Sequence, residues 1–197
     1  MEMDTKNTDT TSHSTPSNWD RKTLGEIAQV SSGGTPNRSR SDYWRGNIPW
    51  VMTSQLDFCT IDSFKEFITL KGLKNSAAKL FPEGTVLMAM YGQGPTRGKV
   101  ALLGKPATTN QACAAIQPDN SVSNTYLYHY LTSIYEQIRD RSNDGSQKNL
   151  NGRIVKSIQV VLPPRPEQRA IAEALSDVDA LIERLDALIA KKRAVKT

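Results

Sequence analysis

The pattern of apolar and polar positions divides the chain into a polar start, a mixed body and a strongly periodic end. Residues 1–18 hold almost no large apolar side chains and are crowded with Thr, Ser and Asn, so we expect a disordered tail. From Trp19 onward, short apolar runs alternate with stretches rich in turn-forming residues. The clearest core strand is residues 84–90, which the glycine-rich segment 91–98 separates from a returning strand at 99–103.

Weaker patterns surround this predicted hairpin. Residues 48–52 and 64–68 have the composition of short strands, residues 72–81 suggest a short helix, and residues 154–162 form a last apolar segment. Apolar side chains recur every three or four positions from Asn124 to about Asp140, which predicts an amphipathic helix. Strands alternating with short helices predict an α+β body over residues 19–165.

The proline-rich stretch 163–166 marks a boundary, and the strongest periodicity of the chain follows it over residues 166–197. Apolar side chains alternate there at spacings of four and three, as in a coiled coil: Ile171, Leu175, Val178, Ile182, Leu185 and Ile189. A long helix that buries nothing is only marginally stable in water, so the stripe needs a partner. Either it folds back on its own body or it packs against another helix, and its narrowness favours the second hypothesis.

Composition adds a preference for certain partners. The net charge of +5 and a pI near 9.2 favour a polyanion over small acidic substrates. Cys59 and Cys113 have neither disulfide-framework nor zinc-site spacing and are interpreted as reduced thiols. Nothing resembles a secretion signal or a membrane-spanning stretch, so we expect a soluble cytoplasmic protein that does not contact membranes.

The sequence offers little for catalysis. The glycine-rich segment 92–100 has the wrong spacing for a phosphate-binding loop, Val100 lacks the hydroxyl that magnesium requires, and the dinucleotide fingerprint fails at Arg97. The two histidines are His13 in the tail and His129, which we interpret as a partly buried helix residue. No paired carboxylates or nucleophile motif are recognisable, and a nucleotide-dependent enzyme is therefore a weak hypothesis.

Three polar segments suit DNA instead. Residues 38–47 interleave arginines with Tyr43 and Trp44, the glycine-rich segment carries amide and cationic donors, and residues 144–151 are rich in amides. Each has a plainer interpretation, because aromatic side chains also anchor loops and surface charges are often merely solvated. The candidate DNA contacts are Arg38, Arg40, Arg45, Ser54, Gln55, Gln93, Arg97, Lys99 and Lys148.

Read in order, several segments resemble the specificity subunits of type I restriction-modification enzymes from Trp19 onward. The resemblance rests on residues 23–28 leading into 32–36, on 43–51, on 84–90 with the glycines after it, on Asn110-Gln111-Ala112, on 145–150, and on 162–172. It implies that Gly33, Gly34, Pro36, Trp50 and Leu150 are scaffold residues.

The same resemblance implies a non-catalytic subunit that reads one half of a bipartite site in double-stranded DNA. Partner methyltransferase subunits would carry S-adenosylmethionine, this chain would bind no cofactor or metal, and a restriction subunit would associate indirectly. The usual family member has two recognition domains and two such helices, whereas this chain has one of each, so a homodimer through the C-terminal helix is expected. A truncated product and an adaptor that does not bind DNA remain the alternatives.

Overall fold

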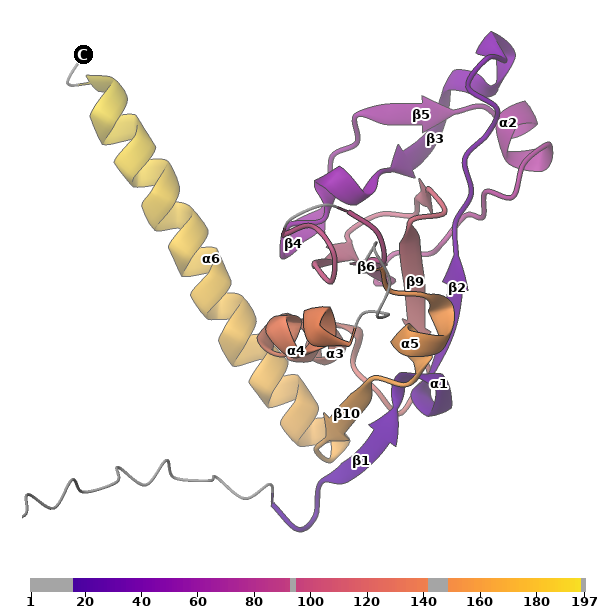
Figure 1. Cartoon of the computed structure of the whole chain (residues 1–197). Coiled ribbons are helices and arrows are strands. Elements are labelled where there is room, and N and C mark those ends of the chain that lie inside the picture. Colours follow the sequence, from indigo (N-terminus) through magenta and orange to yellow (C-terminus); the bar gives the residue numbers. More distant parts are fainter. Residues whose placement is uncertain (1–15, 93–94, 142–148, 196–197) are drawn as a thin grey trace, which may run out of the picture.

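A computed structural model describes residues 16–92, 95–141 and 149–195 (Figure 1). Most of the expected tail at 1–18 lies outside the described residues, as do Gln93 and Lys148. Of that tail, only Pro16 to Asn18 are described, and the backbone N–H of Trp19 donates to the Pro16 carbonyl in a turn.

A five-stranded sheet forms the centre of the body, in the order β2-β9-β6-β7-β4. Its strands are β2 (Ala28–Ser32), β4 (Cys59–Ile61), β6 (Val86–Ala89), β7 (Val100–Leu103) and β9 (Cys113–Pro118). The predicted hairpin is confirmed, since β6 and β7 pair antiparallel with Val86 opposite Leu102. All four residues of β6 are buried because one core cluster takes Val86 and Met88 while another takes Leu87 and Ala89.

Two smaller sheets flank the central one. The first has the order β5-β3-β8 and contains β3 (Trp44–Val51), β5 (Glu66–Ile68) and β8 (Thr108–Thr109). The second consists of β1 (Asp20–Thr23) and β10 (Gln159–Leu162), paired so that Asp20 lies opposite Leu162. The start of the body is therefore bonded to the strand that precedes the C-terminal helix.

Five short helices complete the described part of the body, and three of them begin where a polar side chain caps the backbone. The five are α1 (Leu24–Ile27), α2 (Leu70–Lys74), α3 (Asn124–Ser133), α4 (Tyr135–Asp140) and α5 (Gly152–Lys156), with single 3₁₀ turns at Ser41–Tyr43 and Thr53–Gln55. Thr69, Ser123 and Asn151 accept backbone N–H groups at the starts of α2, α3 and α5.

Three boundaries differ from the sequence-based expectation. The helix expected at 72–81 is α2, which begins two residues earlier because Thr69 caps it, and it ends at Lys74. The single helix expected from 124 to 140 is broken at Ile134, which lies outside the helical region at φ −101° and ψ 19°. The last apolar segment is a helix followed by a strand, α5 and β10.

The C-terminal helix α6 (Arg165–Val195) begins one residue before the expected position. Its first turns pack against α3, where Ala172 is buried in the core and Gln168 is 2% exposed. The Gln168 side chain donates to the carbonyls of Pro163 and Ser121 and accepts the N–H of Ser123, which fixes the root of the helix. From there α6 projects away from the body, as Figure 1 shows. The α+β fold with a long terminal helix is thus confirmed.

Candidate nucleic-acid interface

Arg38 lies in an aromatic and acidic environment rather than free at the surface. Its guanidinium stands 3.7 Å from the ring centre of Trp44 and 4.7 Å from that of Trp50, and it forms a 2.5 Å ion pair with Glu66. Trp50 itself is buried, and its indole N–H donates to the Gly34 carbonyl. Arg38 therefore joins the loop after β2 to the β3–β5 pair, and its charge is largely compensated within the chain.

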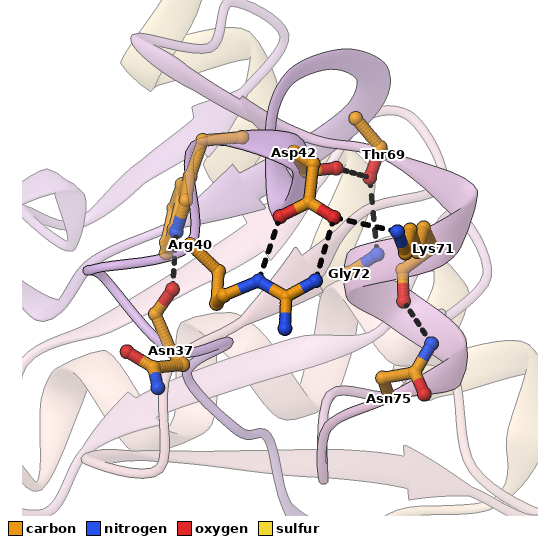
Figure 2. A network of polar contacts seen from close by, with 8 residues as sticks. Asn37, Arg40, Asp42, Thr69, Lys71, Gly72 and Asn75 are labelled. Carbon is orange, nitrogen blue, oxygen red and sulfur yellow. Dashed lines mark hydrogen bonds and ion pairs between the residues drawn. The ribbon is translucent and has the colours of Figure 1, made fainter.

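Arg40 is held in a second intramolecular network, drawn in Figure 2. Its Nε and a terminal nitrogen donate to the two carboxylate oxygens of Asp42 at 3.0 and 2.9 Å, and Lys71 approaches the same carboxylate at 2.6 Å. Arg40 first and Lys71 second hold the pKa of Asp42 well below its usual value. Thr69 donates its hydroxyl to the Asp42 carbonyl, so the network also ties α2 to the turn before β3.

Arg45 is the candidate of segment 38–47 that points into solvent. It has a positive φ of 62°, and the pairing of β3 with β5 shifts register between Trp44 and Ile48. A bulge of this kind redirects a side chain away from the sheet face. Arg45 is exposed and has no ion pair within residues 16–92, 95–141 and 149–195.

The remaining described candidates for DNA contact differ in exposure and in their partners within the chain. Ser54 is exposed, whereas the Gln55 side chain accepts the Met52 N–H in a local turn. Lys99 forms a 2.5 Å ion pair with Asp57, and Arg97 is half-buried near the end of the glycine-rich segment. Of the predicted contacts, Arg38 and Arg45 line one shallow hollow beside Lys65 and Glu66. Arg38, Arg40 and Lys99 are already paired with carboxylates.

A hollow that the sequence did not predict lies at one end of the central sheet, and we name it the α5 hollow. Segments that are far apart in the sequence meet there, because the Met90 N–H donates to Ala112 and the Leu150 N–H donates to Met90. It is lined by Val30, Ser31, Ser32, Met90, Tyr91, Gln111, Ala114, Gly152, Arg153 and Lys156. Asn110-Gln111-Ala112 and Leu150 were noted as family-like landmarks, but nothing in their spacing indicated that they meet.

The apolar stripe of α6 is exposed once the helix leaves the body. Ile171 packs partly against the core, but Leu175, Val178, Ile182, Leu185 and Ile189 are 43–53% exposed. Leu181 and Leu188 are exposed to a similar degree and widen the stripe by a further column. With Leu181 and Leu188, the seven exposed side chains form a broader apolar face than the two-in-seven stripe expected from the sequence, and the role of that stripe stays a prediction.

His129 lies in a groove between the root of α6 and the body. Its Nε2 is 3.0 Å from the Ser176 hydroxyl and its Nδ1 is 3.8 Å from the Asp179 carboxylate. Burial lowers the pKa of His129, and the neighbouring Asp179 acts in the opposite direction. His129 was expected to be a partly buried helix residue. It lies in α3 as expected and is buried more completely, with its side chain 8% exposed.

Metal-binding clusters and membrane-spanning helices are both absent from the described residues. These residues contain no cluster of three His, Cys, Asp or Glu side chains arranged to hold a metal ion. Within the same part of the chain, no helix is long and apolar enough to cross a membrane.

A body with separate polar loops and a projecting amphipathic helix defines a binding module, and sequence comparison identifies its class. Residues 16–191 match the type I restriction modification DNA specificity domain, and the chain belongs to this family.

Individual relatives agree with this assignment. The chain is 34% identical to the type I restriction enzyme MjaIX specificity subunit of Methanocaldococcus jannaschii over 85% of its own length and 39% of the relative's. It is 30% identical to the EcoR124I/EcoR124II specificity subunit of Escherichia coli, over 81% of this chain and 41% of that one. The crystal structure of the HsdS subunit from Thermoanaerobacter tengcongensis superposes with a TM-score of 0.66 at 18% identity, covering 90% of this chain and 41% of that one. The chain thus spans about two fifths of the length of these relatives.

Proposed function

We propose that this chain recognises one half of a bipartite DNA site and directs partner methyltransferase subunits, and through them a restriction subunit, to that site. The observation that carries the proposal is the family match over residues 16–191, which includes both the body and most of α6. In this proposal residues 19–165 form the recognition domain and residues 166–197 the assembly helix. The chain contributes no catalytic group, and S-adenosylmethionine binds to the partner.

A homodimer through α6 would supply the second half of the site. The exposed apolar face supports it, because such a face is stable in water only when it is covered. The charges of α6 favour an antiparallel arrangement: the acidic residues Glu173 and Asp177 lie near its root, and Lys191, Lys192 and Arg193 lie near its end. A parallel pair would place the three cations beside their copies, whereas an antiparallel pair brings opposite charges together.

An adaptor that assembles partners through α6 without binding DNA is the second candidate. It is favoured by the internal ion pairs of Arg38, Arg40 and Lys99, which occupy three of the expected DNA contacts. The two candidate functions assign the same assembly role to α6 and differ only in whether the body binds DNA.

The deciding experiment is selection from a library of random DNA duplexes by the full chain at several salt concentrations. Recognition by a symmetric dimer predicts enrichment of an inverted repeat interrupted by a spacer of constant length. The full-length variant Leu175→Asp/Ile182→Asp, which keeps the buried root of α6, tests whether the second half of the repeat depends on the apolar face of that helix. Enrichment of no sequence, alone or with a methyltransferase subunit that co-purifies with the chain, would favour the adaptor.

A further inference from the structure

The α5 hollow combines a recessed shape with uncompensated positive charge. It encloses about 750 Å³, and Val30, Met90 and Ala114 form its apolar floor. The rim carries two cations, Arg153 and Lys156, and none of the described residues that line it is acidic. An anionic ligand with a small apolar part fits this combination.

Both cations are available to a ligand. Arg153 and Lys156 are exposed, and neither side chain has an ion pair or hydrogen bond to the residues that the structure describes. This distinguishes them from Arg38, Arg40 and Lys99, whose charges are compensated by carboxylates. The nearby Glu26 carboxylate is engaged by the Thr23 hydroxyl and N–H at 2.7 and 2.6 Å, so it is directed to its own helix cap.

The position of the two cations is fixed by the fold. Asn151 accepts the N–H groups of Arg153 and Ile154, and Val155 between the cations is fully buried, which anchors α5 against the body. The stem of Lys156 packs on α1, because a Cβ on Gly25 would lie 3.2 Å from the Lys156 Cβ. The backbone of both cations is therefore fixed, and their exposed side chains are left to adjust to a ligand.

The rest of the rim offers further groups to the same ligand. Tyr91 is 40% exposed and presents a ring. Gln111, whose carboxamide oxygen accepts the Thr35 hydroxyl at 2.5 Å, also lines the hollow. Tyr91 also begins the glycine-rich segment. A ligand in the hollow therefore lies directly beside that segment.

We propose that the α5 hollow binds the sugar–phosphate backbone of duplex DNA, with Arg153 and Lys156 on the phosphate and the Tyr91 ring against the deoxyribose. A recessed site suits the backbone, because phosphates and sugars project from a duplex whereas base edges lie inside its grooves. Seating the backbone here places the duplex beside Tyr91, the first residue of the glycine-rich segment. The inference rests on the proposed DNA recognition and adds residues that the sequence analysis did not select.

The test compares DNA binding by the full chain and by the variant Arg153→Gln/Lys156→Gln at several salt concentrations. Each lost phosphate contact lowers the slope of log affinity against log salt by about 0.9, so the variant loses about one to two units of slope. Its affinity falls by about ten- to a hundredfold at low salt, equally for target and unrelated duplexes. The charge-preserving variant Arg153→Lys/Lys156→Arg retains the slope, and melting temperatures verify that all variants fold.

A matched control removes two charges elsewhere. Lys22 and Arg169 are exposed cations that line a different hollow, beside Asn120 and Ser121 beyond the opposite end of β9. Lys22→Gln/Arg169→Gln has the same net charge as the test variant and should retain nearly the wild-type slope.

The outcomes separate the inference from the proposed function. If the wild-type chain selects a target and the Arg153→Gln/Lys156→Gln variant keeps its affinity and salt slope, the proposed backbone contact at the α5 hollow is wrong and the proposed function stands. Loss of target preference without loss of binding to unrelated duplexes also overturns this backbone contact, because that pattern belongs to base readers. A wild-type chain that binds no duplex overturns both.

Discussion

The exposed apolar face of α6 allows a quantitative prediction about self-association. Full burial of an aliphatic side chain contributes ~1.5–3 kcal/mol, and the seven side chains of the face are about half exposed, so covering each one contributes ~1 kcal/mol. Leu175→Asp with Ile182→Asp removes two such side chains from each protomer. A symmetric dimer therefore loses ~4 kcal/mol, and its dissociation constant rises about a thousandfold.

Light scattering over a concentration series measures this effect. The wild-type chain should approach twice its 21.8 kDa mass, and the double variant should stay near the single-chain mass over the same concentrations. Ala187→Asp/Ala190→Asp is the matched control, since both positions are exposed and lie on the side of the helix away from the stripe. The reasoning is refuted if the double variant remains as dimeric as the wild type, or if the wild type is monomeric at every concentration.

Three further predictions concern the body. Gly34→Ala should destabilise the fold by about 3 kcal/mol, because the new Cβ would lie 2.4 Å from the Ala77 carbonyl carbon. In the control variant Gly152→Ala the new Cβ meets nothing within 4 Å, so its melting temperature should stay near that of the wild type. Equal melting temperatures for the two variants would contradict this packing. Burial raises the pKa of Cys113 to about 12, so iodoacetamide at about pH 8 should alkylate only the half-buried Cys59 in the folded protein, and a second adduct by intact mass would disagree. The pKa of His129 in the folded protein lies below its ordinary value of 6.5, so its contribution to stability is complete above that pH and is lost as the pH falls through the folded pKa. His129→Gln should therefore reduce the drop in melting temperature between about pH 7.5 and 5.5. A drop equal to that of the wild type would exclude this role.

The features that the sequence predicted are those with a local cause. The β6–β7 hairpin follows from an unbroken apolar run ended by glycines, and α6 follows from a period maintained over many turns. The DNA candidates were less predictable because pairing partners are set by tertiary structure. Glu66 reaches Arg38 only through the pairing of β3 with β5, and no local pattern connects the two residues.

The α5 hollow illustrates the same limit. Its wall depends on hydrogen bonds from Met90 to Ala112 and from Leu150 to Met90, which bring three distant segments together. Arg153 and Lys156 follow the amide-rich stretch that attracted attention in the sequence, and their exposure becomes informative only when the concave surface beside them is known.

The pairing of β1 with β10 has a consequence for how such a chain can be altered. Asp20 and Leu162 are paired in the β1–β10 ladder, so the first and last strands of the body lie side by side, next to the root of α6. Two cuts just outside these two strands would release the entire body as a cassette with adjacent ends. Under the proposed function, a body with the same closing strands and the same contacts to Gln168 and Ala172 can be exchanged for another one without altering the rest of α6.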